Sequence, residues 1–441
     1  MKNVQQFAIF VLALVQCIFS YGQKSNLNEI AQKFEPILQG QKKGVAVLIK
    51  KDGKIESTGI GKFDLSAQSV FNIGSATKTF TAILILQEFE KGNLKLSDSI
   101  GKYLTPIVNV DPSLNIEALL SHESGLDEVI SGNLKNILFA KNDSIYNDNL
   151  LYQIEKNSPE KIGKFNYCNT NYFLLGKILE KVSDQSYFDL VRTRIIEPLG
   201  LKHTYAYLHK SIRNLATPYY QGEDISDYLD HRFFADIAYS AGSIASTLND
   251  MEVFYTALYE TEKLLKKDTL KLMLESGNDI YGYGIFKLKL NDRTFYGHGG
   301  NNMGYAFRNE YDPQTKDLVM IFSNEMSIPS RNLIKSDVWA YLKDEPLKHF
   351  DGVDIAKFKD YTGTFLIKEA NLTFEISIEN DKMYMIVASQ GVKSELVQND
   401  EISLYDTTVG VILSKIEDDA QGLMFEQNGF KTKVLKIDNT N

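Results

Sequence analysis

The pattern of hydrophobic and polar residues changes along the chain, and each change predicts a different kind of element. Two strand-like segments, Val45–Lys50 and Lys54–Ile60, flank the turn-forming pair Asp52-Gly53 and predict a β-hairpin. Farther along, apolar residues recur at helical spacing in Tyr172–Lys181 and Tyr187–Ile196. We therefore expect helices in the middle of the chain.

Strand-like patterns return between Gly282 and Ser323, before a helical segment at Leu333–Leu342. The predicted strands of this region are Tyr283–Leu290, Arg293–Tyr296, Tyr305–Tyr311 and Leu318–Ser323. An early hairpin and late strands fit one antiparallel sheet with helices inserted between them. We predict an α/β (α+β) catalytic domain with a helical subdomain, and an active site in the cleft where the two meet.

The last part of the chain has a different character. After the polar segment Lys343-Asp344-Glu345-Pro346, alternation dominates, as in Leu372–Ile378 and Lys382–Val387. Turn signals recur, and about eight short strands fit between Tyr361 and Ile437, which predicts a small all-β barrel. We place the catalytic domain at residues 23–346 and the barrel at 347–441.

The amino terminus resembles a secretory signal peptide. Lys2 precedes the apolar stretch Phe7–Val15, and small residues follow near Ser20 and Gly22, so residues 1–22 are predicted to be removed. The apolar stretch is too short for a transmembrane span. An alternative is a lipoprotein signal ending at Cys17, against which the bulky Gln16 argues. We expect an exported protein, periplasmic or secreted.

Charge and composition exclude several classes of function. The net charge is −9, and removal of Lys2 with the signal makes it −10, which argues against nucleic-acid binding. Neither a His-Glu-x-x-His motif nor a Cys/His cluster is present, so no metal is expected. No nucleotide-binding glycine motif accompanies a strand–helix unit, so no cofactor is expected. Of the two cysteines, Cys17 leaves with the signal and Cys168 remains, which excludes an internal disulfide.

Lys78 follows Ser75 by three residues, and both precede a nearly continuous apolar segment, Phe80–Leu86. Residues at this spacing share a helix face, so the ammonium can lie beside the hydroxyl. Burial lowers the pKa of a lysine toward that of a general base, and a helix start stabilises negative charge. The same Ser-x-x-Lys spacing at Ser99 and Ser158 lies in polar or turn-forming surroundings. The alternative is that Ser75 only caps a helix running to about Lys91.

Two further motifs add polar side chains. Tyr167 and Asn169 form the single Tyr-x-Asn in the sequence. A tyrosine beside a lysine can be a phenolate or a proton relay, and the amide can hold the lysine and a substrate carbonyl. His298-Gly299-Gly300-Asn301 follows a predicted strand, and its glycines let a substrate approach and leave backbone N–H groups free. A polar loop and a glycine-rich turn, respectively, are the structural alternatives.

Together these motifs resemble the serine β-lactamase and penicillin-binding-protein superfamily, specifically the branch of class C β-lactamases and D-alanyl-D-alanine carboxypeptidases. The order Ser75-x-x-Lys78, Tyr167-x-Asn169, His298-Gly299-Gly300 is that of the family. Three connecting segments also resemble it, namely Leu119–Leu126, Ile196–Leu201 and Ala241–Thr247. Tyr361–Phe365 is similar to the opening of lipocalin-like domains that are appended to these hydrolases.

The resemblance implies a serine hydrolase that acts through an acyl-enzyme on esters, amides, D-amino-acid peptides or β-lactams. Ser75, Lys78 and Tyr167 would be catalytic; Asn169, His298, Gly299, Gly300 and Asn301 would contact the substrate or the oxyanion. The third motif departs from the usual Lys-Thr-Gly, His-Ser-Gly or His-Thr-Gly. It lacks the lysine and the hydroxyl that bind a substrate carboxylate, so we expect carboxylate-bearing substrates to be disfavoured.

Three rival interpretations remain at this point. One is a β-lactamase or D-alanyl-D-alanine carboxypeptidase proper, and another is a catalytically silent cell-wall binding or sensor protein with the same fold. The third is a metal hydrolase, for which the sequence lacks ligands. A thiol nucleophile at Cys168 is also weighed, but Cys168 has no histidine near it in sequence. We interpret Cys168 as a packed, unreactive thiol. The expected partner is a small-molecule or short-peptide substrate, such as one derived from the cell wall.

Overall fold

The computed structural model describes residues 27–38, 43–61, 65–128, 158–220, 222–290, 293–325, 331–345, 347, 352–368, 372–390, 392–406, 410–416, 419–427 and 430–437. The predicted signal peptide and Pro346 lie outside these ranges. The chain divides into two compact units: one is Glu35–Ile328, and the other joins Met1–Phe34 to Pro329–Asn441. The domain boundary that we place at 346 stays a prediction.

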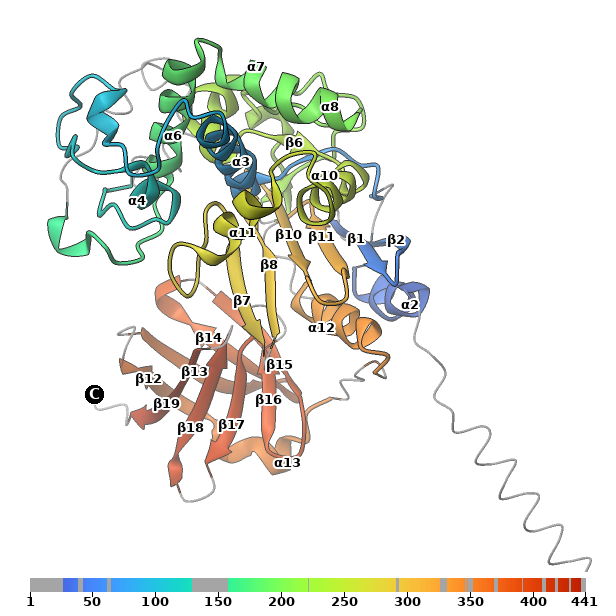
Figure 1. Cartoon of the computed structure of the whole chain (residues 1–441). Coiled ribbons are helices and arrows are strands. Elements are labelled where there is room, and N and C mark those ends of the chain that lie inside the picture. The colour runs from blue at the N-terminus through green and yellow to red at the C-terminus, as the bar shows by residue number, and fades with distance from the viewer. Residues whose placement is uncertain are drawn as a thin grey trace, which may run out of the picture. The chain divides into compact units, whose positions relative to one another are not determined.

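The larger unit is built on a seven-stranded antiparallel sheet with the order β2-β1-β11-β10-β8-β7, in which β9 pairs with β10 (Figure 1). Its strands are β1 (Gly44–Lys51), β2 (Lys54–Gly61), β7 (Phe286–Leu290), β8 (Arg293–Gly297), β9 (Gly300–Asn302), β10 (Tyr305–Tyr311) and β11 (Leu318–Ser323). The hairpin and the late strands do form one sheet, which confirms the predicted antiparallel architecture.

Local residue types explain the hairpin and the centre of the sheet. Asp52 and Gly53 have φ values of 50° and 74°, the left-handed conformation that a two-residue hairpin turn requires. β1 pairs with both β2 and β11, and seven of its eight residues are buried. α10 (Leu248–Glu260) packs against β1 and β11. The enclosed strand is accordingly apolar from Val45 to Ile49, whereas the edge strand β2 is mostly exposed.

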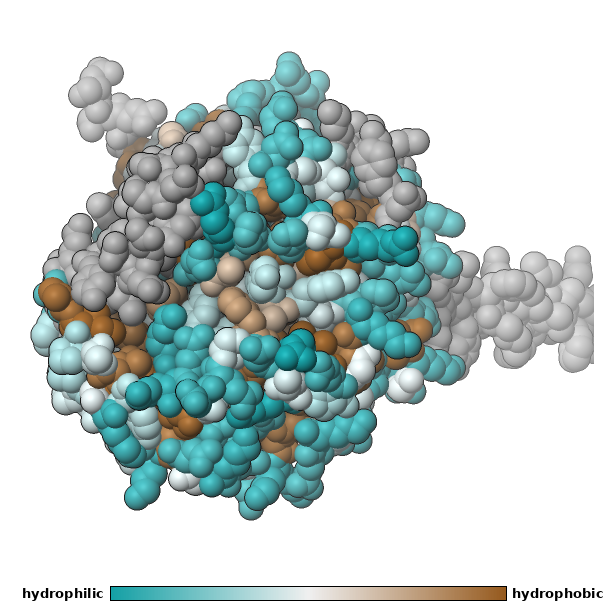
Figure 2. All heavy atoms as spheres, turned by 90° about the horizontal axis from the view of Figure 1, so that it is seen from above, coloured by the Kyte–Doolittle hydropathy of each residue, from teal (hydrophilic) through white to brown (hydrophobic). Residues whose placement is uncertain are grey.

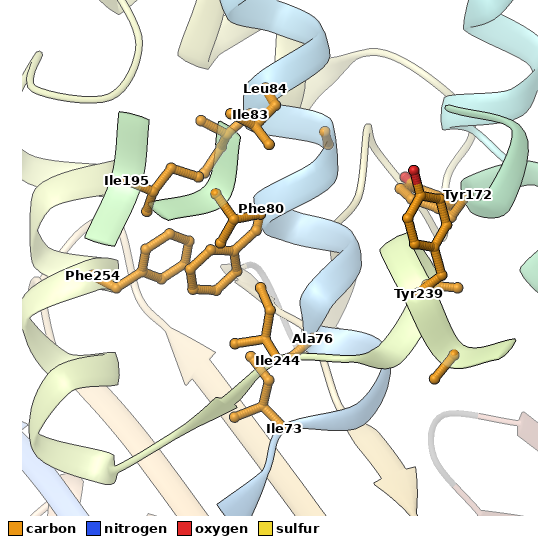
Figure 3. Packing of buried hydrophobic residues seen from close by; sticks show 14 of the residues in the cluster. Ile73, Ala76, Phe80, Ile83, Leu84, Tyr172, Ile195, Tyr239, Ile244 and Phe254 are labelled. Carbon is orange, nitrogen blue, oxygen red and sulfur yellow. The ribbon is translucent and has the colours of Figure 1, made fainter. Parts of the chain in front are cut away.

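The buried helix α3 (Thr77–Glu90) is the centre of the helical part of this unit. It contacts α6 (Asn169–Ser183), α7 (Tyr187–Val191) and α9 (Tyr239–Gly242). Figure 3 shows Phe80 of α3 facing Phe254 of α10, with ring centroids 3.9 Å apart and nearly parallel planes. The aromatic pair and its aliphatic neighbours therefore fix α3, and with it the residues at its amino-terminal end.

The remaining short elements connect these parts. They are β3 (Phe71–Asn72), α4 (Ile116–Leu120), α8 (Glu197–Leu199), β4 (Tyr219–Tyr220), β5 (Glu223–Asp224), β6 (Ala245–Ser246) and α11 (Lys267–Glu275). Two segments, Arg192–Ile196 and Phe233–Ala238, are wound as π-helix. The predicted helix Tyr187–Ile196 is thus an α-helical turn that widens before Pro198, which has no N–H to donate.

The second unit contains α12 (Arg331–Leu342) and a closed barrel of eight antiparallel strands. Lys33, in α2 (Leu27–Leu38), donates to Asp337 of α12 over 2.6 Å. The strands are β12 (Gly363–Ile367), β13 (Leu372–Glu379), β14 (Lys382–Val387), β15 (Val392–Gln398), β16 (Ser403–Asp406), β17 (Ile412–Ile416), β18 (Asp419–Gln427) and β19 (Phe430–Ile437). Buried apolar side chains, among them Phe365, Phe374 and Leu413, form a separate core. The predicted barrel is confirmed.

In the view of Figure 2, hydrophilic residues predominate and hydrophobic ones are scattered among them. Among the described helices, none has the length and apolar character needed to cross a membrane.

Candidate active site

Ser75 lies in a tight turn that neighbouring segments hold in place. The turn Gly74–Ala76 is 3-10 helix, directly before α3, so Ser75 precedes the α-helix that we expected it to begin. Gly74 has a φ of 52°, a backbone conformation that residues other than glycine rarely adopt. The Asn72 side chain accepts from the Gly74 N–H and donates to three carbonyls in Gly242–Ile244. The nucleophile candidate therefore sits on a fixed backbone.

Lys78 is fully buried, and its Nζ has three oxygen partners. The distances are 3.1 Å to Ser75 Oγ, 2.6 Å to Asn169 Oδ1 and 2.9 Å to the Ala241 carbonyl. The amide and the carbonyl oxygen can only accept hydrogen bonds, so a neutral lysine must donate its two hydrogens to them. Its lone pair then faces the Ser75 hydroxyl. Of the three partners, only Ser75 can donate a proton to it.

Burial also means that a substantial fraction of Lys78 is neutral near pH 7. Desolvation lowers the Lys78 pKa to about 7, and the negative charge of Glu128 opposes that shift only in part. A general base works best when its pKa lies near the pH of operation. A pKa in this range is what a general base at Lys78 would require, and its role as the base stays a prediction.

Tyr167 lies close to both Ser75 and Lys78. It shares a hydrogen bond with Ser75, and the Lys78 ammonium lies 5.1 Å from the centroid of its ring. Burial raises the pKa of its phenol well above the usual range, and the Ser75 hydrogen bond opposes that rise only partly. Tyr167 therefore keeps its proton at neutral pH. Of the two roles that the motif allows, the geometry favours the proton relay over the phenolate.

Asn169 links the lysine to a carboxylate. Its Oδ1 accepts from Lys78, while its backbone N–H and its Nδ2 donate to one oxygen of Glu128 at 2.7 and 2.9 Å. The polar side chains form a continuous chain from Glu128 through Asn169 and Lys78 to Ser75. Glu128 is only partly buried, so the site joins the buried amine to a carboxyl group near the surface.

The segment around Tyr167 is anchored by a second histidine. His122 is fully buried, and its Nδ1 accepts from the Cys168 backbone N–H at 3.1 Å and lies 3.1 Å from Nδ2 of Asn171. Its ring centroid lies 4.2 Å from that of Tyr167. His122 thus supports both the backbone after Tyr167 and the face of the phenol ring.

The third motif contributes backbone close to Ser75. A Cβ on Gly300 would lie 2.0 Å from the Ile73 carbonyl and 2.6 Å from the Ser75 nitrogen. A Cβ on Gly74 would lie 2.9 Å from the Asn301 nitrogen. The absence of side chains at Gly74 and Gly300 therefore lets β9 approach the nucleophile turn. This approach brings the backbone of Ser75 and that of Asn301 into one small region.

The sequence profile of the Beta-lactamase family matches residues 30–341. The chain belongs to the Beta-lactamase family. This assignment confirms the predicted superfamily, and the enzyme is accordingly a serine hydrolase related to penicillin-binding proteins.

Individual relatives agree with the family assignment. A penicillin-binding protein of Bacillus subtilis (strain 168) is 24% identical, over 85% of this chain and 89% of its own. The teichoic acid D-alanine hydrolase of Staphylococcus aureus is 28% identical, over 64% of this chain and 71% of its own. The solved octameric penicillin-binding protein homologue from Pyrococcus abyssi has a TM-score of 0.62 at 21% identity, covering 89% of this chain and 95% of that one. That likeness supports the fold.

In this Beta-lactamase family member the histidine of the third motif faces the protein interior. His298 is 1% exposed, and burial lowers its pKa to about 3, so the ring is neutral. Its Nδ1 lies 2.6 Å from the Gly299 carbonyl and must donate to it, so Nε2 accepts from the Tyr281 hydroxyl at 2.7 Å. The single N–H of the ring is therefore used within the protein.

The remaining cysteine has the properties of a packed thiol. Cys168 is buried, and its Sγ lies 3.3 Å from the Asp127 carbonyl. Burial and the nearby charge of Glu128 raise its pKa to about 11. A thiol nucleophile needs a lowered pKa, so the environment opposes thiol chemistry.

The sequence analysis did not identify three residues that lie at the site, namely Ala241, Glu128 and Tyr281. The Ala241 carbonyl lies within the recognised Ala241–Thr247 segment, but its role depends on main-chain direction. Glu128 closely follows the Leu119–Leu126 segment, and Tyr281 carries no motif at all. Among the described residues, no cluster of histidine, cysteine, aspartate or glutamate is arranged to hold a metal ion.

Proposed function

We propose that this protein is an exported serine hydrolase that forms an acyl-enzyme on Ser75 and acts on D-aminoacyl esters or amides. The observation that carries the proposal is the position of Lys78. Two obligate acceptors, Asn169 Oδ1 and the Ala241 carbonyl, leave its lone pair directed at the Ser75 hydroxyl. A serine so placed beside a lysine base is an activated nucleophile.

The proposed reaction has two halves. Lys78 accepts the Ser75 proton as Oγ attacks the substrate carbonyl, and the backbone N–H groups of Ser75 and Asn301 stabilise the oxyanion. The proton taken up by Lys78 is relayed through Tyr167 to the departing alcohol or amine, which leaves both side chains in their starting protonation states. Water, activated by the same lysine, then attacks the acyl-enzyme and releases the acid. His298, Gly299 and Gly300 shape the wall along which the substrate lies.

The proposed substrate class rests on charge and on a relative. A D-aminoacyl group carries a free α-ammonium, and the Glu128 carboxylate, which bonds Asn169, is an anion within the site that can pair with it. The Staphylococcus aureus relative is a teichoic acid D-alanine hydrolase. Both observations favour a small acyl group bearing an amine.

The rival functions make different demands on this site. A β-lactamase or D-alanyl-D-alanine carboxypeptidase must bind a carboxylate, and the buried neutral His298 supplies neither a charge nor a free N–H for that purpose. A catalytically silent binding protein does not require a general base, so it would not explain why a buried lysine with a lowered pKa contacts the serine hydroxyl. Export remains a proposal, because residues 1–22 and Cys17 lie outside the described residues.

The test compares matched substrates with one enzyme preparation. We expect wild type to hydrolyse D-alanine methyl ester faster than its N-acetyl and L-alanine counterparts, and faster than a chromogenic cephalosporin. Glu128→Gln should reduce the preference for the free amine over the N-acetyl ester by about tenfold, since a charge-assisted hydrogen bond contributes roughly 1.5–3 kcal/mol. Faster turnover of the cephalosporin than of any ester would contradict the proposal. Secretion of the full-length chain, with removal of residues 1–22, tests export.

A further inference from the structure

Tyr281 links the segment before β7 to the histidine of the third motif. It is fully buried, and its hydroxyl lies 2.7 Å from Nε2 of His298. Because Nδ1 of that ring donates to the Gly299 carbonyl, Nε2 carries no proton and needs a donor. The Tyr281 O–H supplies it. The hydrogen bonds therefore run in one direction, from the tyrosine through the imidazole to the Gly299 carbonyl.

The surroundings of Tyr281 leave its side chain little freedom. Its backbone N–H donates to Oδ1 of Asn278 at 2.9 Å, and its carbonyl accepts from the Asn278 N–H at 3.0 Å. Its ring packs edge-on against Phe286 of β7, with ring centroids 4.7 Å apart. Its oxygen is also within hydrogen-bonding reach of Tyr172, whose own proton goes to the Leu120 carbonyl. The hydroxyl is therefore held at a fixed point.

Two consecutive glycines follow the histidine, and their backbone needs a brace from elsewhere. Glycine has no Cβ to restrict φ and ψ, so the peptide group between Gly299 and Gly300 could rotate easily. The His298 ring holds the carbonyl of this peptide group at 2.6 Å. From β10, Nδ2 of Asn309 donates to the His298 carbonyl at 2.7 Å. Both peptide groups that precede Gly300 are thus fixed by side chains.

The braced backbone leads directly to the proposed oxyanion site. A Cβ on Gly300 would lie 2.6 Å from the Ser75 nitrogen, so β9 touches the nucleophile turn here. The N–H of Asn301, the next residue of β9, is the proposed second donor. A rotation of the peptide group before Gly300 would move this donor relative to the serine. Its position therefore depends on the ring of His298.

We propose that Tyr281 is a positioning residue for acyl transfer, which holds the oxyanion donor at Asn301 in place through the imidazole of His298. The histidine of the third motif then acts as a strut inside the protein and does not itself bind the substrate. This proposal rests on the acyl-enzyme function proposed above and adds a residue to it. A preorganised donor stabilises charge that appears only in the transition state, so its displacement lowers kcat more than it changes KM.

The first test removes one hydroxyl. Tyr281→Phe keeps the ring that packs on Phe286. On phenyl acetate, a neutral ester, kcat should fall about tenfold, less than on loss of a donor itself, while KM stays within about twofold. Tyr283→Phe is the matched control and should retain wild-type kinetics, because the buried Tyr283 donates instead to Glu117 at 2.6 Å. Equal losses in the two variants, or a change confined to KM, would overturn the proposal.

A double-mutant cycle tests whether the tyrosine acts through the histidine. His298→Leu removes the acceptor, so adding Tyr281→Phe to it should lower kcat by less than about twofold further. A second tenfold loss in that background would overturn the proposal. Circular dichroism should show all variants folded.

Nitrogen-15 NMR of the histidine-labelled enzyme supplies a readout that does not depend on His298→Leu being active. The resonance of the unprotonated His298 nitrogen, assigned by its absence in His298→Leu, should shift in Tyr281→Phe and stay in place in Tyr283→Phe. An unshifted resonance in Tyr281→Phe would also overturn the proposal.

The same substrate separates this proposal from the underlying function. Unchanged turnover of phenyl acetate by Ser75→Ala would refute the acyl-enzyme function, whatever the result for Tyr281→Phe. Loss of turnover in Ser75→Ala, together with wild-type kcat in Tyr281→Phe, would retain the function and refute the role of Tyr281. Because phenyl acetate carries no amine, neither result depends on the preference for D-aminoacyl groups.

Discussion

Gly300 faces the backbone nitrogen of Ser75 so closely that a Cβ on Gly300 would lie 2.6 Å from it. The same Cβ would lie 2.0 Å from the Ile73 carbonyl. Neither contact can relax through a flexible side chain, because both partners are backbone atoms. The geometry of the proposed oxyanion site thus depends on a missing side chain.

We therefore predict that Gly300→Ala lowers kcat by at least about 10²-fold, the usual effect of disturbing one oxyanion donor. Gly299→Ala is the matched control, since the nearest atom to its Cβ would be 3.5 Å away, an ordinary contact. It should retain activity within about threefold on a neutral ester. Circular dichroism should show both variants folded. Equal activities of the two variants would contradict the close approach of β9.

Ser75→Ala should abolish acylation and reduce turnover by about 10⁶, by analogy with removal of the nucleophile from a protease triad. Intact-mass analysis after a fluorophosphonate probe should show one adduct on wild type and none on this variant. Ser99→Ala is the control, because Ser99 and Lys102 repeat the Ser-x-x-Lys spacing in a polar setting. It should label like wild type. A catalytically silent binding protein would show no adduct in either case.

The pH profile should report Lys78. Its lowered pKa, about 7, means that the lysine is protonated and inactive as a base below that pH and neutral above it. On a neutral aryl ester, kcat/KM should rise tenfold per pH unit below about 7 and then level off. Glu128→Gln removes a negative charge that raises the Lys78 pKa, so the acid limb should move to lower pH. An acid limb unaffected by Glu128→Gln would assign it to another group.

The sequence identifies the candidate catalytic side chains more readily than it identifies the residues around them. Ser75 and Lys78 are neighbours on one helical segment, so their proximity follows from spacing alone. Glu128 reaches the site only because Asn169 bonds it across 41 residues of sequence. Gly300 reaches the Ser75 turn through the packing of β9 against it, which the Gly-rich pattern does not predict. Such contacts depend on tertiary pairing and carry no local signal.

Fold elements show the same division. The hairpin, β10, β11 and the barrel follow from alternation and turn residues, and their boundaries lie within a residue or two of the prediction. The 3-10 turn at Ser75 was not predicted, because it depends on Gly74 and on the Asn72 side chain. The π-helical turn Arg192–Ile196 was also missed, because apolar spacing does not distinguish α from π winding over one turn.

Phe80→Ala should destabilise the larger unit. Phe80 is fully buried and stacks on Phe254, so truncation removes apolar contact and leaves a cavity that costs about 3–5 kcal/mol. Urea unfolding followed by fluorescence should give this change in the free energy of unfolding. Val253→Ala is the control. Val253 is 41% exposed on the helix that carries Phe254, so its truncation should change the free energy of unfolding by no more than about 0.5 kcal/mol. Similar costs for both variants would mean that this aromatic pair is not part of the core.

Cys168→Ser should retain most activity, although the residue lies between Tyr167 and Asn169. Burial holds the Cys168 pKa near 11, so at pH 8 about one thiol in a thousand is ionised, and the thiolate is the reactive form. The folded enzyme should therefore react with a thiol reagent such as dithionitrobenzoate only after unfolding in urea. Because Sγ lies beside the Asp127 carbonyl, a serine hydroxyl can donate to the same oxygen and leave the Tyr167 backbone in place. Rapid labelling of the folded enzyme, with loss of activity equal to that of Ser75→Ala, would instead identify Cys168 as the nucleophile.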